Sequence, residues 1–327
     1  MKIDINSLQS KNITEDLTKQ ALKDLELYWN SGDGLNEKMI EFVDCSLCDE
    51  NFPEDILFVK NRFPYRKCPN CALIYPSPRP KIEYIYDQYV SGRFSNTFHE
   101  LYLPTADYRM KTIFKERVLH LIMPKVRSGR LLDIGCSSGH FLKVANDNNF
   151  ETFGVEPNPD MVQFANKELN LDNIVNGTLE DAKFDDEYFD IITLWDVLEH
   201  VVDPYELLVG AHRVLKPGGW IFAYTENYES YNIRITGKYS EMVTPDVHLR
   251  HYSPKTFKRE FEKAKYIIDK VYTEGLDVQH IKKTFKTFPD KFPGIDFGVS
   301  DTFEDELQNL ISKHNYGDNL RLIAKKE

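Results

Sequence analysis

Hydrophobic and polar residues follow two different periods along this chain. From Arg130 onward, short apolar runs of strand length are separated by stretches in which apolar residues recur every three or four positions. The predicted strands are, in chain order, RLLDIG, ETFGVE, DNIVN, FDIITLW and WIFAYTE, followed by YIIDKVYTEG and NLRLIAKK. Helices are predicted at HFLKVANDN, MVQFANKEL and PYELLVGAHRVL. This alternation is typical of a doubly wound α/β fold.

The N-terminal part of the chain has other patterns, which divide it into three further regions. Residues 1–40 contain a helical period in ITEDLTKQALKDLELYW, and residues 41–80 hold two cysteine pairs before a proline cluster. Residues 81–126 are helical and rich in aromatic side chains, and we expect them to form a linker or cap. The remaining residues, 127–327, form the α/β domain. Within it, about 277–318 exceeds what a hairpin needs, so we predict an insertion with a loop and a helix, FEDELQNLISKH.

Cysteine spacing gives the first chemical prediction. Four of the five cysteines fall in the close pairs CSLC and CPNC, which comprise Cys45, Cys48, Cys68 and Cys71. This spacing matches a four-thiolate zinc site in which a short β-hairpin brings two knuckles together. Because sulfur fills all four positions, we expect a structural zinc ion with no open site for catalysis. The alternative, a pair of disulfides, suits an exported protein, whereas the polar N-terminus predicts a cytoplasmic one.

Composition narrows the classes of function. The chain has 327 residues, of which 41% are hydrophobic and 28% charged, and this fits one large domain with a smaller module. Its formal net charge of -11 argues against a protein that grips nucleic acid by a broad basic surface. No apolar run reaches the length that spans a bilayer, so we predict no membrane span.

The most informative segment is LLDIGCSSGHFL, in which an apolar strand ends at Asp133, turns through Gly135 and Gly139 and enters a helix. Glycines suit a sharp turn at which a ligand approaches the backbone closely. About twenty residues later, Glu156 ends the next predicted strand, where a carboxylate can accept both hydrogen bonds of a ribose diol. A nucleotide-type cofactor site is therefore predicted at this edge of the sheet.

Four motifs in order resemble those of class I S-adenosylmethionine-dependent methyltransferases: DIGCSSG, GVEPNP, FDIITLWDVLEHVVDP and RVLKPGGWIFAYTEN. The resemblance covers about 130–275 and reaches the C-terminus through NLRLIAKK. It implies a Rossmann-like seven-stranded sheet whose last strand runs antiparallel, with S-adenosylmethionine as cofactor. CPNCALIYPSPRP resembles the zinc ribbon that precedes the catalytic domain in many sugar and small-molecule methyltransferases.

The resemblance assigns cofactor contacts residue by residue. Asp133 and Gly135 would lie against the methionine part of the cofactor, and Glu156 would bind the ribose hydroxyls. The adenine would lie near three residues of NGTLEDA, namely Thr178, Leu179 and Glu180. The family's usual acidic adenine contact is Thr178 here, so Glu180 is the alternative. The predicted cofactor site is completed by residues of the same motifs, namely Cys136, Gly139, Pro157 and Trp195.

Acceptor chemistry is predicted around three histidines. WDVLEHV places Asp196, Glu199 and His200 just beyond the fourth strand, at the sheet edge where such folds bind ligands. His200 is the first candidate for a base or an acceptor contact. The segment VTPDVHLRHYSPKTF resembles methyltransferases encoded with sugar-modifying enzymes, in which a His-rich turn closes over the acceptor. His248 and His251 are thus further catalytic candidates, with the alternative that His251 packs the turn before the next helix.

The D-x-x-E-H pattern also resembles the metal-binding E-x-x-E-H of some quinone and RNA-end methyltransferases. Asp196, Glu199 and His200, together with His248, would then hold a divalent ion. The competing interpretation, which we favour, is that Glu199 and His200 orient the helix without a metal.

The function predicted from these features is methyl transfer to a small-molecule acceptor: a sugar, a nucleotide-linked sugar or a glycan precursor. O-methylation is favoured over C-methylation. One alternative is a tRNA or nucleic-acid methyltransferase whose ribbon binds RNA, which the acidic balance disfavours. Another is a cofactor-binding scaffold that has lost catalysis. The pattern specifies neither the methylated atom nor the oligomeric state.

Overall fold

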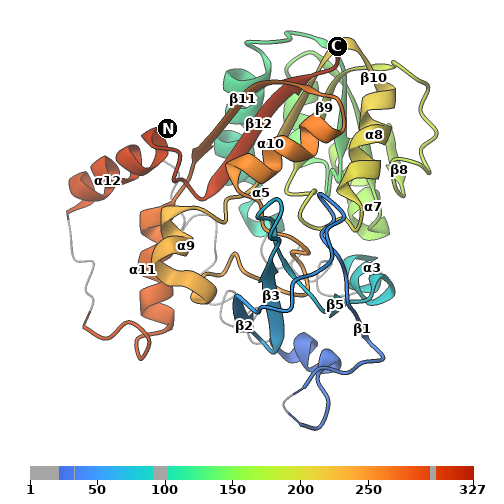
Figure 1. Ribbon diagram of the computed structural model, residues 1–327. Coiled ribbons are helices and arrows are strands. Elements are labelled where there is room, and N and C mark those ends of the chain that lie inside the picture. The colour runs from blue at the N-terminus through green and yellow to red at the C-terminus, as the bar shows by residue number, and fades with distance from the viewer. Residues whose placement is uncertain (1–21, 33, 91–101, 295–299) are drawn as a thin grey trace.

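The computed structural model describes residues 22–32, 34–90, 102–294 and 300–327 (Figure 1). Its largest element is a seven-stranded sheet with the strand order β11-β12-β10-β9-β6-β7-β8. The strands are β6 Gly129–Ile134, β7 Phe150–Glu156, β8 Ile174–Asn176, β9 Phe189–Trp195, β10 Leu215–Glu226, β11 Ile267–Glu274 and β12 Asn319–Lys325. Strands β6 to β10 pair in parallel, whereas β12 is antiparallel to both β10 and β11. The predicted seven strands and the reversed last strand are confirmed.

Helices cover both faces of the sheet because its strands are apolar on both sides. Leu131 and Leu132 are adjacent on β6 yet are buried in two different apolar clusters, as the period of two in a strand requires. The crossover helices are α6 His140–Asn146, α7 Pro159–Leu169, α8 Pro204–Val214 and α10 Pro254–Lys263. The last three begin alike, with a proline directly after a side-chain cap: Asn158, Asp203 or Ser253.

The cysteine module is a small antiparallel structure. Strands β2 Phe58–Lys60, β3 Phe63–Lys67 and β4 Ile74–Pro76 form a three-stranded sheet, and β1 Ile40–Glu41 pairs with β5 Arg79–Pro80. The β2–β3 hairpin lies between the two cysteine pairs in the sequence, as the zinc-ribbon prediction requires. The structure shows helix only up to Tyr28 in the described part of the N-terminal segment, where η1 Glu26–Tyr28 ends. The predicted periodic stretch ends at Trp29, one residue beyond this helix, and residues 1–21 lie outside the described residues.

The helical linker consists of α3 Ile82–Val90 and of a helix that runs from α5 Leu103–Arg109 through the wider turns η3 Met110–Phe114 and η4 Arg117–Ile122. The insertion between β11 and β12 contains α11 Asp277–Thr287 as well as the predicted helix, α12 Asp301–Lys313. The sequence predicted one loop and one helix in this insertion, and α11 was not predicted. This helix is lysine-rich but is held by packing against α9 Tyr231–Thr236 and α12. In Figure 1 the ribbon strands, α9 and α11 all lie below the seven-stranded sheet.

The helices of the structure can be compared with the prediction of no membrane span. Within the described ranges, the model contains no helix with the length and apolar character needed to cross a bilayer.

Candidate functional site

A single large cleft of about 2980 Å³ runs along the carboxyl ends of the parallel strands. Ordinary small-molecule pockets measure about 300–1,000 Å³, so this one has room for a cofactor and an acceptor together. Most of the predicted site residues line it: Asp133, Gly135, Cys136, Glu156, Pro157, Thr178, Leu179, Glu180, Trp195, His200 and His248. Gly139 and His251 are not among the residues that line this cleft.

The turn after β6 depends on its glycines. Gly135 and Gly139 have φ angles of 73° and 76°, in the left-handed region that favours glycine. A Cβ on Gly135 would lie 2.9 Å from Cγ2 of Val197, and one on Gly139 would lie 2.7 Å from Cδ1 of Leu171. Gly135 therefore keeps the turn open where it faces the cleft, whereas Gly139 lets helix α6 pack against its neighbours.

Glu156 faces this turn from the end of β7. Its Oε2 accepts a hydrogen bond from the backbone N–H of Ser137, and its Oε1 accepts one from that of Asn158, both at 2.9 Å. The side chain is buried, and burial raises the pKa of its carboxyl group. Two fixed donors hold the carboxylate while each oxygen keeps a further lone pair. The donor set and the glycine turn fit a bound nucleoside with two ribose hydroxyls.

The other predicted cofactor residues differ in their surroundings. Asp133 is buried, its Oδ1 accepts a 2.6 Å hydrogen bond from Thr193, and burial raises its pKa to about 7. Trp195 is also buried, with the guanidinium of Arg117 4.4 Å from the centre of its ring. Its indole Nε1 has no hydrogen-bond partner in the structure, so a donor beside the cleft is unsatisfied.

On the adenine side, Thr178 is engaged within its own turn. Its hydroxyl and its backbone N–H both donate to Oδ2 of Asp181 at 2.9 Å. Leu179 is buried and Glu180 is exposed. A hydroxyl already occupied in this way favours Glu180 as the adenine contact, and this assignment stays a prediction. Cys136 is a buried thiol that packs against Gly154, where an added Cβ would lie 2.6 Å from its Sγ.

Two of the predicted histidines lie together. The imidazole rings of His200 and His248 are 4.8 Å apart between centroids. Nδ1 of His200 lies 2.9 Å from the carbonyl oxygen of Val247. Nδ1 of His248 lies 2.9 Å from the carbonyl oxygen of Met242 and 3.0 Å from Oε2 of Glu226.

The two rings have opposite protonation tendencies. Burial and the charge of His248 lower the pKa of His200 well below its ordinary value. Burial also disfavours the charged form of His248, but the carboxylate of Glu226 outweighs it and raises the pKa of His248 to about 9. Paired groups with separated pKa values are typical of acid–base sites. Near pH 7, His200 is therefore neutral and His248 is charged.

Glu199 completes this cluster. One ligand atom each of Glu199, His200 and His248 lies within 4.8 Å of the others. Glu199 is 2% exposed, and neither of its carboxylate oxygens has a hydrogen-bond partner among the residues that the structure describes. Burial, and then the nearby Asp196, raise its pKa to about 8. A buried carboxyl without a partner is costly, so this position suits a proton, a cation or a ligand donor.

His251 is a neighbour of His248, with 6.0 Å between the ring centroids, but it does not line the same cleft. It is 5% exposed and lines a separate cavity of about 300 Å³ together with Tyr228 and Ser253. Its backbone N–H donates to the carbonyl oxygen of Ile74 in the ribbon, at 2.7 Å, and its ring packs against Tyr65. The surroundings favour the packing alternative, while the catalytic role of His251 stays a prediction.

The four predicted zinc ligands converge. Their Sγ atoms all lie within 4.8 Å of one another, with 3.4 Å between Cys45 and Cys71 and 3.5 Å between Cys48 and Cys68. A tetrahedral ion with Zn–S distances of about 2.3 Å places its sulfurs about 3.8 Å apart. A hydrogen bond from Cys45 lowers the pKa of Cys71 to about 5, which favours the thiolate that a metal binds. The cluster fits one zinc ion with four sulfur ligands.

The ribbon is tied to the histidine cluster by Arg250, which the sequence did not single out. This side chain is 1% exposed, and it donates to the carbonyl oxygens of Leu198, Val201 and Val202, on either side of His200. Its Nε also donates to Oγ of Ser46, inside the first cysteine pair, at 3.3 Å. One buried guanidinium thus joins the first zinc knuckle to the turn that carries Glu199 and His200.

Three other cleft residues were also missed: Glu226, Lys60 and His280. Glu226 is the last residue of β10 and of the predicted strand WIFAYTE, so its position at a strand end was a usable signal. Lys60 lies in the β2–β3 hairpin and His280 in α11. No sequence spacing relates these two residues to the cleft, because only tertiary packing brings their elements there.

The parallel sheet, its glycine turn and an acidic residue at the end of the second strand together define a cofactor-binding α/β domain with the strand order of class I methyltransferases. The chain belongs to the methyltransferase domain family. A family model described as "Methyltransferase domain" matches residues 106–270. S-adenosylmethionine is the cofactor of this family, and the four-cysteine cluster adds a zinc ribbon.

Curated relatives are similar over the same part of the chain. The ubiquinone biosynthesis O-methyltransferase of Hydrogenovibrio crunogenus is 31% identical over 117 residues, which cover 34% of this chain and 48% of that protein. The enzyme of the same name from Coxiella burnetii is 27% identical over 139 residues, covering 38% and 59%. The chain spans about half the length of these relatives. A solved Thermotoga maritima structure, titled a "possible histamine N-methyltransferase", has a TM-score of 0.49 at 22% identity and covers 72% of this chain and 97% of its own.

Proposed function

We propose that the protein transfers the methyl group of S-adenosylmethionine to a hydroxyl group of a small-molecule acceptor. The observation that carries this proposal is that one cleft holds both the cofactor turn and two neighbouring histidines, His200 and His248, whose ring centroids are 4.8 Å apart. Relatives named as O-methyltransferases support an oxygen nucleophile. As the finer proposal, the acceptor is a sugar, a nucleotide-linked sugar or a glycan precursor, which rests on the resemblance of the segment around His248.

S-adenosylmethionine supplies a methyl carbon that is already electrophilic, so the chain has to orient the acceptor, exclude water and remove a proton. The Nδ1–H of neutral His200 donates to Val247, which leaves the ring's lone pair on Nε2. We assign the acceptor's proton to this Nε2. The charged ring of His248, held by Glu226, stabilises negative charge on the acceptor oxygen as the proton leaves.

The test is a methylation assay with S-adenosylmethionine and two acceptor panels, nucleotide sugars and simple phenols, read by mass spectrometry. We expect mass gains of one methyl group on a hydroxyl. His200→Gln should reduce the rate by about 100-fold or more, since general bases contribute about 10²–10⁴. His212→Gln, on α8, is the matched control and should keep the wild-type rate. Cofactor binding without methylation of either panel would reject the proposed function in favour of the scaffold alternative.

A second candidate adds a divalent cation at Glu199, His200 and His248. The two unpartnered oxygens of Glu199 favour it, because a cation would satisfy them. Metal analysis of wild-type protein and Glu199→Gln separates it from the ribbon zinc: a second ion per chain that only the variant lacks would establish the site. Full methylation by protein that carries zinc alone would exclude it.

A further inference from the structure

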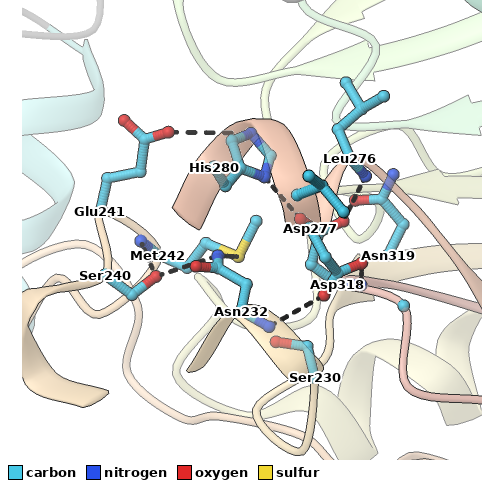
Figure 2. Close-up of polar contacts among 12 residues, drawn as sticks. Ser230, Asn232, Ser240, Glu241, Met242, Leu276, Asp277, His280, Asp318 and Asn319 are labelled. Carbon is cyan, nitrogen blue, oxygen red and sulfur yellow. Dashed lines mark hydrogen bonds and ion pairs between the residues drawn. The ribbon is translucent and has the colours of Figure 1, made fainter. Parts of the chain in front are cut away.

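The β11–β12 insertion brings a second charged histidine to the cleft (Figure 2). Nδ1 of His280 lies 2.5 Å from Oδ2 of Asp318, whose side chain is fully buried. The side chain of His280 is 14% exposed, and its Nε2 points towards Glu241, on the loop after η5 Gly237–Tyr239. The carboxylate of Asp318 therefore fixes the ring so that one N–H faces away from it, towards this loop.

The backbone at Gly275 and Leu276 accommodates the side chain of Asp318. Its Oδ1 accepts a hydrogen bond from the N–H of Leu276, and a Cβ on Gly275 would lie only 1.8 Å from that oxygen. Asp277, whose side chain accepts from the N–H groups of Asn232 and Asp318, lies in the same buried network. Buried charged groups add little to stability and often cost it. The buried carboxyl group of Asp318, which Gly275 accommodates and Asp277 supports, orients His280, and this arrangement points to a role in binding.

Two basic side chains contact the carboxylate of Glu241, and a third basic side chain contacts the backbone of the residue before it. Nε2 of His280 lies 3.7 Å from its Oε1, and Nζ of Lys283, one turn further along α11, forms an ion pair with its Oε2. Lys60 reaches the same loop from the ribbon, where its Nζ donates to the carbonyl oxygen of Ser240 at 2.7 Å. The Glu241 side chain is 42% exposed, more than those of Lys283 at 26% and His280 at 14%. An exposed loop carboxylate thus occupies a more buried cationic site.

We propose that His280, Lys283 and Lys60 bind an anionic oxygen group of the acceptor, a carboxylate or a phosphate, and that Glu241 occupies this site until the acceptor displaces it. The inference rests on the proposed function, because the ligand is the acceptor of that reaction. Carboxyl groups already lie beside the other histidine pair of the cleft: Oε2 of Glu226 is 3.0 Å from Nδ1 of His248, and Glu199 lies against both rings. An acceptor with one anionic end would therefore bind in one direction, with its hydroxyl group towards His200.

The test measures binding by calorimetry to protein loaded with S-adenosylhomocysteine. Two matched pairs of probes are used: uridine monophosphate with uridine, and 3,4-dihydroxybenzoate with catechol. We expect the anionic member of one pair to bind about 10-fold or more tightly than its neutral partner. The pair that shows this preference identifies phosphate or carboxylate as the group. Equal binding within both pairs would overturn the proposal.

Variants locate the site. His280→Gln and Lys283→Met should each remove most of the preference for the anionic probe and leave the neutral probe unaffected. Lys258→Met, which breaks an ion pair of another helix with Glu262, is the matched control and should change neither. Glu241→Gln should strengthen binding of the anionic probe, because it removes the competing carboxylate. Weaker anionic binding in Glu241→Gln, or an unchanged preference in Lys283→Met, would contradict the proposal.

These experiments distinguish a failure of the anion-binding inference from a failure of the proposed function. Methylation of neutral acceptors with no preference for anions would remove this inference and leave the proposed function standing. Anion-selective binding that depends on His280 and Lys283, without methylation of any acceptor, would remove the proposed function and support this inference alone.

Discussion

We predict that cofactor binding depends strongly on Glu156. Its two oxygens accept the N–H groups of Ser137 and Asn158, so an amide in its place would turn an NH₂ group towards a backbone donor. We expect Glu156→Gln to weaken binding of S-adenosylhomocysteine by about 10-fold or more, equivalent to about 1.4 kcal/mol or more. Calorimetric titration measures this. Glu151→Gln, on the exposed side of the same strand, should change the affinity by less than about 2-fold; equal effects of the two changes would refute the role of Glu156.

The charge of His248 gives the reaction a pH dependence. The pKa of this ring is raised to about 9, so its charged form persists through neutral pH and is lost as the pH rises through that value. We expect kcat to fall above about pH 9 in the wild-type protein, with no matching fall in His248→Gln, which would be slower at every pH. Rate–pH profiles of the two proteins, with His212→Gln as the control, decide this. A wild-type rate that stays constant through pH 10 would show that the charge of His248 is not used.

Single residues differ in how well the sequence alone predicts their place in the site. Asp133, Gly135 and Glu156 lie at strand ends and at a tight turn, positions that a local pattern specifies, and all three line the cleft. His251 belongs to the same His-rich turn as His248, yet its backbone N–H is bonded to Ile74 and its ring packs against the ribbon. These two histidines of one loop have ring centroids only 6.0 Å apart, yet they line different cavities. The cause is what packs against each face of the loop, and no local pattern encodes this.

At the scale of elements, the zinc ribbon is coupled to the turn that carries His200. Arg250 joins Ser46 of the first knuckle to three carbonyl oxygens of that turn. We expect removal of zinc, by Cys71→Ser or by a chelator, to increase hydrogen exchange of amides in residues 198–202 by about 10-fold or more and to lower methylation. Cofactor affinity should change little, because the hydrogen bonds of Glu156 go to Ser137 and Asn158 in the cofactor turn and its neighbour and not to the cysteine cluster.

A matched change tests this coupling. Cys136→Ala removes the fifth cysteine, which lies outside the cluster, and should leave the zinc content and the exchange of residues 198–202 as in the wild type. Unchanged exchange in Cys71→Ser, despite loss of zinc, would show that the ribbon folds and acts independently of the turn.

Elements were predictable where their pattern is local. The strands of the α/β domain and helix α12 follow from period and capping, for example from Ser253 with Pro254 at the start of α10. Helix α11 was not predicted, because four of its eleven residues, His280, Lys282, Lys283 and Lys286, are basic, and its apolar positions are few. Its stability comes from Val278, Ile281 and Phe285, which are buried by neighbouring elements from distant parts of the chain.

For the whole molecule, buried acidic groups dominate the pH dependence of stability. Burial raises the pKa of Asp133, Asp196 and Glu260 to about 7 and that of Glu199 to about 8. A folded-state pKa above the unfolded value gives stability that is complete at low pH and is lost as the pH rises through the folded value. His248, raised to about 9, acts in the same direction. We therefore expect the thermal midpoint to fall steadily between pH 6 and pH 9.

Scanning calorimetry across this range, without cofactor, measures the expected fall. Glu199→Gln should flatten part of the curve, because an amide cannot ionise, and should raise the midpoint at pH 9. Glu206→Gln, an exposed position on α8, is the control and should follow the wild-type curve. A midpoint that rises from pH 6 to pH 9 would contradict the assignment of raised pKa values to these buried groups.

The sequence by itself determined the α/β class, the cofactor turn and the four zinc ligands. Each of these depends on spacing within one motif or on the order of motifs, and short-range geometry fixes both. The reversed last strand was implied by the resemblance to class I methyltransferases. Tertiary structure alone decided which side chains share the cleft: Lys60 from the ribbon, Glu226 from β10 and His280 from the insertion come from three distant segments. It also decided the protonation states of His200 and His248, because burial and the nearest carboxylate set a pKa, and both depend on residues far away in the chain.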